Sequence, residues 1–365
     1  MTRSEKKKRY DGMLIFVVLL LVAAGLVILY STSAYNGQVK FHDPFHYLKK
    51  QGFATLLGLF GMALIARVDY HKWVPLAIPA YVTSIILSVA VIFFGDEYNG
   101  SKRWLSLGPI SFQPSEFAKV AVIFFLACLV SRNVQRMKRF RTMILMMIPV
   151  LPIVGLVGAS NLSTAIIILG IAVVLIFVAD PKYVRFILMG SIGVGFMTVF
   201  LAMESYRLER LAIWRHPEQY EKGYQTLQGL YAIGSGGLFG KGLGESMQKL
   251  GFIPEAQNDM IFSVICEELG LFGAVCLILL YLLIIWRLMI IANNASDLYG
   301  ALIVVGIMAH LSIQVLLNIA VVTNTIPNTG VSLPFISYGG TSISILLAEM
   351  GLALSVSRGI KLEVA

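Results

Sequence analysis

The chain has 365 residues, 57% of them apolar and 13% charged, and it carries a net charge of +9. A soluble domain has about 25% charged residues. Here the apolar residues form long blocks, so the composition excludes an ordinary soluble domain and indicates a polytopic membrane protein. Because Lys and Arg gather on the cytoplasmic loops of such proteins, the positive charge does not require a nucleic-acid partner, and we expect none.

Apolar runs of roughly 17–25 residues predict membrane-spanning helices. The first run follows a basic N-terminus and is too long for a signal peptide, so we expect it to be retained as a helix. The sequence predicts an all-α protein with about ten membrane helices, near 12–32, 51–66, 74–94, 114–131, 143–158, 162–180, 186–204, 260–286, 300–322 and 341–357. Pro149 and Pro152 interrupt the fifth run, so nine helices with one re-entrant segment is the alternative.

Charged loops predict the orientation of what we expect to be a single integral membrane domain, residues 1–365. With ten helices both chain ends lie on one side, and that side holds 17 of the 29 Lys and Arg residues. The positive-inside rule then predicts that the basic N-terminus, 1–11, and the tail, 358–365, are cytoplasmic. Loops 33–50, 95–113 and 205–259 face outside, and the last is a large extracellular loop directly before the eighth helix.

Two of the outer loops carry polar side chains that can bind a ligand. In the segment 99–119, Arg103 lies at the outer surface, and Glu116 and Lys119 enter the fourth helix at i, i+3, where they can pair. Ions inside a membrane span are costly and therefore functional candidates, with an interface anchor and a structural ion pair as the alternatives. In the segment 328–342, Ser337 and Tyr338 offer hydroxyls to a polar ligand, or they belong to a structural turn.

The glycine-rich segment 234–244 is not a nucleotide-binding loop. The Walker pattern GxxxxGK[ST] would need glycine where Ser235 stands and a hydroxyl residue where Gly242 stands. Glycines can still let backbone N–H groups approach a phosphate, and a plain flexible turn is the favoured alternative.

Asp259 stands at the boundary between this polar loop and the eighth helix. A carboxylate that is partly removed from water can have a raised pKa and act as a general base. Taken alone, however, an Asp at the start of a helix is more often an N-cap. Glu267 and Glu268 follow two turns into the same helix, and His310 and Glu349 lie within other apolar runs. Each of these four is an intramembrane ionisable group that needs a partner.

Together these segments resemble the SEDS family of shape, elongation, division and sporulation proteins, which includes FtsW, RodA and SpoVE. The resemblance covers about 99 to 342 and rests on NGSKRW, QPSEFAK, NLSTA, GYQTLQGLYAIGSGGLFGKGLGES, KLGFIPEAQNDMIFSVICEELG and NTGVSLPFISYGGTS, in that order. The sequences of the glycine-rich segment and of the last segment are more similar to FtsW and SpoVE than to RodA.

The resemblance implies a peptidoglycan glycosyltransferase that polymerises lipid II, a disaccharide-peptide on undecaprenyl pyrophosphate, at the outer face of the bacterial cytoplasmic membrane. The essential acidic residue of the family corresponds to Asp259, which would act as the general base. Arg103, Lys119 and Arg210 are the candidates for contact with the pyrophosphate, and Glu116 would hold Lys119. A divalent cation, Mg²⁺ or Mn²⁺, is compatible with this chemistry, but the sequence contains no evident ligand cluster for one.

The family also implies a class B penicillin-binding protein as partner, in cell division, elongation or sporulation. Two other functions stay open: a lipid II flippase and a non-catalytic scaffold of a division complex. A flippase needs a polar lining through the full membrane depth, and the intramembrane Glu267, Glu268, His310 and Glu349 favour it. The other candidate catalytic and binding residues lie at the outer end of the membrane helices, and this favours the enzyme.

Overall fold

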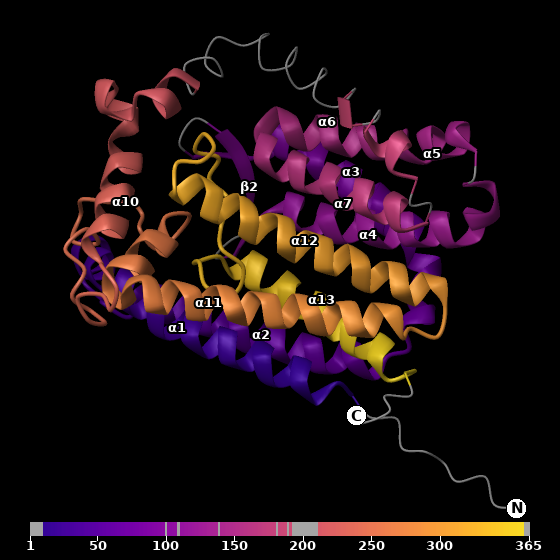
Figure 1. The fold of residues 1–365 in the computed structure, drawn as a ribbon, viewed down its shortest axis with the longest axis horizontal. Helices are drawn as coiled ribbons and strands as arrows, with labels where there is room; N and C mark the ends of the chain where they lie inside the picture. Colours follow the sequence, from indigo (N-terminus) through magenta and orange to yellow (C-terminus); the bar gives the residue numbers. More distant parts are fainter. Residues whose placement is uncertain are drawn as a thin grey trace, which may run out of the picture.

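The computed structural model describes residues 10–98, 101–107, 110–137, 139–179, 182–187, 190–191 and 211–360. Long helices lie side by side along the molecule, with the start of α1 and the end of α13 at one end and helix α10 at the other (Figure 1). The α-helices are α1 Gly12–Phe41, α2 His46–Arg67, α3 Ala77–Phe94, α4 Pro114–Asn133, α5 Phe140–Met147, α6 Val150–Ser160, α7 Leu162–Ala179, α10 Tyr224–Ser235, α11 Ile261–Asn293, α12 Leu298–Val322 and α13 Gly340–Ser357. Short 3₁₀ helices are η1 Tyr70–Leu76, η2 Val134–Arg136, η3 Pro217–Gln219 and η4 Glu221–Gly223.

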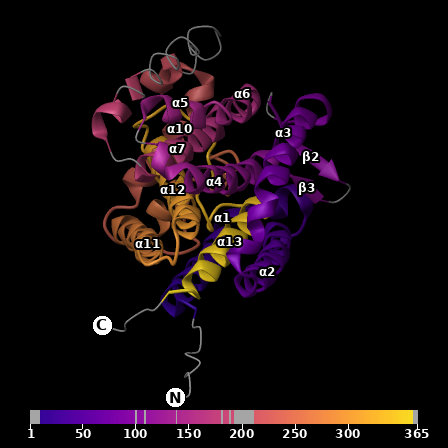
Figure 2. The same cartoon turned by 90° about the vertical axis from the view of Figure 1, so that its right-hand side faces the viewer.

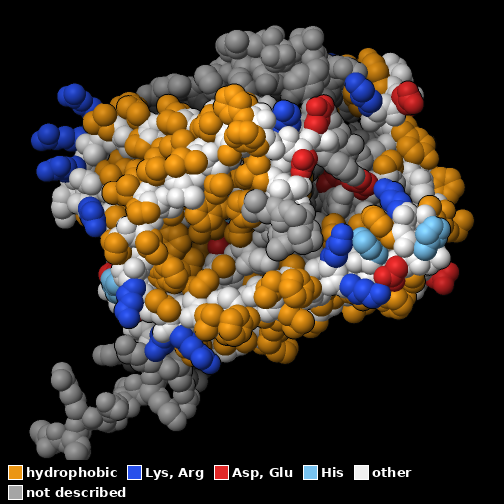
Figure 3. Space-filling model, turned by 180° about the vertical axis from the view of Figure 1, so that it is seen from behind, with side chains coloured by type: hydrophobic (Ala, Val, Ile, Leu, Met, Phe, Trp, Pro, Cys, Tyr) orange, Lys and Arg blue, Asp and Glu red, His pale blue; other side chains and the backbone are white. Residues whose placement is uncertain are grey.

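Within the described residues, seven helical segments are long and apolar enough to cross a membrane, or eight if the bent pair α5 and α6 forms one span. Apolar side chains cover the middle of the molecule, and Lys and Arg gather at its two ends (Figure 3). The chain is therefore a multi-pass membrane protein, as the composition predicted. The total of ten stays a prediction, because most of the segment 186–204 lies outside the described residues and the 22-residue α2 is not among the seven.

The fifth predicted helix is two helices. α5 ends at Met147, α6 begins at Val150, and their axes are bent by 42°. Pro149 lies between them and has no N–H group to continue the first helix. The interruption read from the sequence is thus a sharp bend.

A small antiparallel sheet, which the sequence did not predict, forms in the loop between α3 and α4. Its strands are β1 Asp96–Tyr98, β2 Ser101–Leu107 and β3 Ile110–Phe112, in the order β1-β2-β3. Asp96 pairs with Trp104 across the first two strands, and its carboxylate accepts a hydrogen bond from the Ser106 hydroxyl. The sheet gives Arg103, which lies on β2, a defined position above the bundle.

α12 lies inside the bundle, between four other helices. It packs against α4, α7, α11 and α13, and its buried face runs from Tyr299 to Val322. Viewed end-on, α11 and α12 lie on the opposite side of the bundle from α2 and α3 (Figure 2). Any polar side chain on the inner face of α12 can therefore reach several helices at once.

Candidate active site

A cavity of about 710 Å³ lies where the loops 95–113, 211–260 and 323–339 meet the helix ends. It gathers residues from the segments 99–119, 205–259 and 328–342, which the sequence pointed to and which are far apart in the chain, but none from the glycine-rich segment 234–244. The predicted site residues on its wall are Arg103, Glu116, Lys119, Asp259 and Tyr338.

Asp259 is half-buried in this wall and does not cap the following helix. α11 begins at Ile261 with Met260 as its N-cap residue, and no side chain caps it. The expectation that Asp259 is a helix cap is therefore wrong, because the chain turns once more before the helix starts. The carboxylate is instead bound by Gln225, whose Nε2 donates to Oδ1 at 3.3 Å.

The surroundings of Asp259 favour its protonated form. The pKa of Asp259 is raised from 3.8 to about 6: burial is the largest cause and the nearby Glu255 carboxylate adds to the rise, while Gln225 and Arg103 oppose it. A carboxylate with a pKa near 6 is mostly ionised at neutral pH and yet basic enough to accept a proton from a reacting group. This is the chemistry expected of a general base.

Arg103 and Asp259 both lie beside Gly330. A Cβ atom added to Gly330 would lie 3.6 Å from Arg103 Nη1 and 3.8 Å from Asp259 Oδ2. Gly330 has φ +66°, so glycine is favoured there for its backbone as well. The Arg103 Nε also donates to the Ser160 carbonyl at 3.2 Å, which fixes the guanidinium over the cavity.

Glu116 and Lys119 form the ion pair that their spacing predicted. Lys119 Nζ lies 2.8 Å from Glu116 Oε1 and donates to Gln314 Oε1 at 2.9 Å. The Lys119 side chain is only 1% exposed, so its charge needs both partners. Gln314 Oε1 also lies 2.9 Å from His310 Nε2, and the other ring nitrogen of His310 lies 2.9 Å from Glu349 Oε2.

Two other predicted residues do not contribute to the described wall. The Ser337 hydroxyl accepts a hydrogen bond from the Leu333 N–H at 2.8 Å, which places Ser337 in a turn behind the cavity. Its neighbour Tyr338 faces the cavity and stacks edge-on against Tyr47 at 5.0 Å. Arg210, a candidate for the pyrophosphate, lies outside the described residues.

The sequence did not single out Gln225 and Gln314 as site residues, and it gave Asn318 no role there. Asn318 Nδ2 donates to the Asp259 carbonyl at 2.8 Å and to the Val331 carbonyl at 2.7 Å, so it ties the two loops that carry the site. A signal existed for α12: His310, Gln314 and Asn318 follow one another at i, i+4 and i+8 in an otherwise apolar helix, which is a single polar face. No comparable signal pointed to Gln225.

Among the described residues, no group of three or more His, Cys, Asp and Glu side chains is placed to hold a metal ion.

Known proteins are similar in sequence to this chain over most of its length. A family model for FtsW, RodA and SpoVE, described as "Cell cycle protein", matches residues 11–362. The chain belongs to the FtsW/RodA/SpoVE family. This confirms the resemblance drawn from the motifs.

Members of the FtsW/RodA/SpoVE family match over nearly their whole length. The stage V sporulation protein E of Bacillus subtilis is 39% identical over 97% of this chain and 98% of its own. A probable peptidoglycan glycosyltransferase FtsW of Trichlorobacter lovleyi is 35% identical, over 97% of this chain and 94% of its own.

Solved structures of the family share the fold. A chain of a peptidoglycan synthase complex, solved to explain how polymerization and crosslinking are coordinated, superposes with a TM-score of 0.81 at 31% identity, covering 97% of this chain and 99% of that one. The rod shape determining protein RodA of Thermus thermophilus gives 0.71 at 31% identity, with 97% and 98% covered.

Proposed function

We propose that this chain is a peptidoglycan glycosyltransferase that polymerises lipid II, with Asp259 as its general base. The enzyme class follows from its relatives, which include proteins named peptidoglycan glycosyltransferase FtsW. The observation that carries the catalytic role is the position of Asp259: a half-buried carboxylate, with its pKa raised to about 6, on the wall of a cavity that also holds Arg103 and Lys119.

In the proposed reaction, a sugar 4-hydroxyl attacks the anomeric carbon of a lipid-linked donor. A new C–O bond forms as the bond from that carbon to the pyrophosphate oxygen breaks, and Asp259 takes the hydroxyl proton. Attack from the face opposite the leaving group inverts the anomeric centre, so a β-1,4 link results and no covalent enzyme intermediate is needed. The products are the lengthened glycan and undecaprenyl pyrophosphate.

The leaving pyrophosphate is already a weak base, so it needs positive charge rather than a proton. Arg103 and Lys119 provide this charge on the described wall. Glu116 and Gln314 hold Lys119 in a fixed position, which supports a preorganised anion site.

The cavity's place in the bundle supports an enzyme at the outer face of the bacterial cytoplasmic membrane, with both chain termini in the cytoplasm. Its described lining extends no deeper than Lys119 on α4, Ile167 on α7 and Gln314 on α12, all in the part of these helices nearest the loops. A lipid II flippase needs a polar path through the whole depth, and Glu349 is buried against His310 instead of lining such a path. The flippase reading therefore has less support.

The proposed partner is a class B penicillin-binding protein, a membrane-anchored transpeptidase. Its support is the likeness to a chain from a complex that coordinates polymerization with crosslinking. Such a partner would crosslink the strands that this chain makes.

The substitution Asp259→Asn tests the proposal in a polymerisation assay with labelled lipid II. The amide keeps the shape of the side chain and cannot accept the proton, so we expect the rate to fall by about 10²–10⁴-fold. Ser337→Ala is the matched control on the neighbouring loop, because its hydroxyl lies behind the wall, and it should retain most activity. A folded Asp259→Asn protein that polymerises like the wild type would show that another group is the base.

A further inference from the structure

Helix α11 is broken at Gly270, whose backbone has φ 66° and ψ −166°. The break frees two N–H groups that an unbroken helix would satisfy internally. A segment of the preceding loop supplies their partners: the Leu271 N–H donates to the Gly237 carbonyl at 2.9 Å, and the Phe272 N–H donates to the Leu238 carbonyl at 3.0 Å. Two carbonyl groups of the loop thus replace the acceptors that the preceding turn of the helix would have provided.

The same break frees two carbonyl groups, and the same loop satisfies them. The Glu267 carbonyl accepts from the Lys241 N–H at 2.9 Å, and the Glu268 carbonyl accepts from the Gly242 N–H at 2.9 Å. Residues 237–242 and the break in α11 therefore form one hydrogen-bonded unit. Because few waters reach a helix at membrane depth, such an exchange is what allows the break to exist there.

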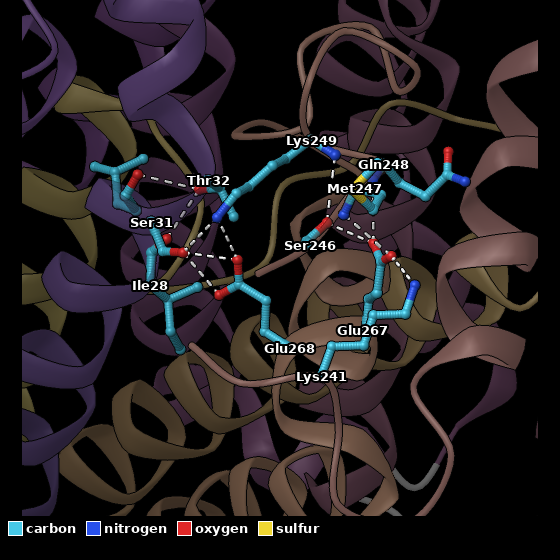
Figure 4. A network of polar contacts seen from close by, with 11 residues as sticks. Ile28, Ser31, Thr32, Lys241, Ser246, Met247, Gln248, Lys249, Glu267 and Glu268 are labelled. Atoms are coloured by element: carbon cyan, nitrogen blue, oxygen red, sulfur yellow. Dashed lines mark hydrogen bonds and ion pairs between the residues drawn. The ribbon is translucent and has the colours of Figure 1, made fainter. Parts of the chain in front are cut away.

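The Glu267 side chain fixes the next part of the loop (Figure 4). Its carboxylate is fully buried and accepts from Lys241 Nζ at 2.6 Å, from the Ser246 hydroxyl at 2.5 Å, and from the backbone N–H groups of Met247 at 3.2 Å and Gln248 at 3.3 Å. A buried carboxylate is stable only with such partners. One charge therefore holds the loop from 241 to 248.

The Glu268 side chain points the other way and fixes the end of that segment to helix α1 (Figure 4). Lys249 Nζ lies 2.6 Å from Glu268 Oε1 and 3.1 Å from the Ser31 hydroxyl, which itself donates to Glu268 at 2.7 Å. Glu268 is 2% exposed, so this pair too is removed from water. The contact joins the loop, α1 and α11.

The short stretch from Lys249 to Asp259 has little freedom once Lys249 is fixed. Ile253 and Ala256 are fully buried. Gln257 accepts from the Asn36 side chain at 3.1 Å through Oε1, and its carbonyl accepts from the Tyr338 N–H at 2.9 Å. The restraint at Lys249 is thus carried to the cavity wall through packed and hydrogen-bonded residues.

We infer that Glu268 and Lys249, with Glu267 and Lys241, are positioning residues that hold Asp259 at the cavity wall. None of the four is among the residues that line the cavity. They act on the reaction through the loop that they fix, not by touching substrate. The inference rests on the proposed function, because it assigns these charges to the placement of the general base.

A charge exchange tests the inference in the full-length protein with labelled lipid II. Glu268→Lys and Lys249→Glu each leave two like charges facing each other, and the resulting shift of Asp259 should lower the rate at saturating lipid II by about 10²-fold. The double variant restores opposite charges, and the Ser31 hydroxyl can still donate to one and accept from the other, so we expect most of the rate to return. The pH at which the rate is half-maximal should move in the single variants and return in the double variant.

The exposed ion pair Lys49–Asp43 is the matched control. Its atoms are 2.7 Å apart, against 2.6 Å for Lys249 and Glu268, but the Lys49 side chain is 69% exposed, so Lys49→Glu should change neither the rate nor the pH profile. If the single variants are not recovered as folded protein, Ser31→Ala tests the positioning role instead, because it removes only the hydroxyl that joins the pair to α1. We expect this variant to have a lower rate with an unchanged KM.

Two results would overturn the inference. Folded Glu268→Lys or Ser31→Ala protein with wild-type rate and pH profile would show that the pair does not place the base. A double variant as slow as the single ones, at equal thermal stability, would show that the charges are not acting as a pair. An active Asp259→Asn protein would overturn the proposed base itself. If Asp259→Asn is inactive but Glu268→Lys has the wild-type rate, only the positioning role is overturned.

Discussion

Asp259 combines two properties: its carboxylate is half-buried, and its backbone is held in place. The Asn318 amide binds its carbonyl, while Gln225 binds its carboxylate. Glu255 is the nearby like charge that makes ionisation less favourable. A carboxylate placed in this way costs folding free energy, which is typical of catalytic groups.

The pH dependence of the rate follows from the pKa of Asp259. The base must be ionised to accept a proton, and its pKa is about 6, so we expect polymerisation to rise with pH and to reach half its maximum near that value. Gln225→Leu removes a hydrogen bond that lowers the pKa, and it should move the midpoint to higher pH. A rate profile measured between pH 4.5 and 8.5, with product length as a second readout, checks both expectations. A midpoint near 4 would mean that Asp259 is fully hydrated in the working enzyme.

The same shift predicts how Asp259 affects stability. Because the pKa is raised from 3.8 to about 6 in the folded state, its contribution favours folding fully below 3.8 and is lost as the pH rises through about 6. Above that range the ionised Asp259 destabilises the protein. Asp259→Asn should therefore melt at a temperature equal to or above that of the wild type at pH 8, while being inactive. A strongly lowered Tm would indicate a structural role.

At the scale of elements, Gly236 and Gly240 in the segment 234–244 serve packing of backbone on backbone. A Cβ atom on Gly240 would lie 2.2 Å from the Glu268 carbonyl oxygen, and one on Gly236 would lie 1.9 Å from that of Cys266. These glycines are not among the lining residues of the cavity. The segment is tied to α11 by the hydrogen bonds described above, and this accounts for its glycines better than a loop around a phosphate does.

Two glycine substitutions separate this role from simple loop flexibility. Gly240→Ala adds a Cβ that meets α11, at a residue with φ +77°, so we expect a loss of about 1–3 kcal/mol in unfolding free energy. Gly234→Ala is the matched control, because it lies in α10 with nothing within 4 Å of its added Cβ, and it should be neutral or slightly stabilising. Thermal unfolding in lipid nanodiscs measures both. Equal Tm values for the two variants would contradict the packing role.

At the scale of the whole molecule, the cavity and the basic loop after α4, which we expect to be cytoplasmic, lie at opposite ends of the helices. Glu97 lines the cavity and is exposed, and Arg136 is exposed in the loop after α4, at the other end. In a background without native cysteines, a membrane-impermeant maleimide added to intact cells should label Glu97→Cys and leave Arg136→Cys unlabelled until the cells are opened. The reverse pattern would place the cavity on the cytoplasmic side.

The helices of this fold were readable from the sequence because membrane spans are long apolar runs. The ion pair Glu116–Lys119 was readable because its partners are three residues apart on one helix. Lys241 and Glu267 are 26 residues apart, one in a loop and one in a helix, and no local spacing joins them. An isolated Gly270 inside an apolar run gave no sign of a break either, since its cause lies in the loop and not in the helix. Local patterns thus predicted elements and near neighbours, whereas loop-to-helix contacts required the fold.

The break in α11 also has a consequence for how the chain is made. Residues 237–242 precede α11 in the sequence, so they have left the ribosome before the helix that they complete. Until they dock, α11 can satisfy the same four backbone groups internally as one straight helix, the form in which an apolar segment enters the bilayer. This order of synthesis allows α11 to enter the bilayer as one straight helix. Residues 237–242, which are already synthesised, can then dock on it and produce the break at Gly270.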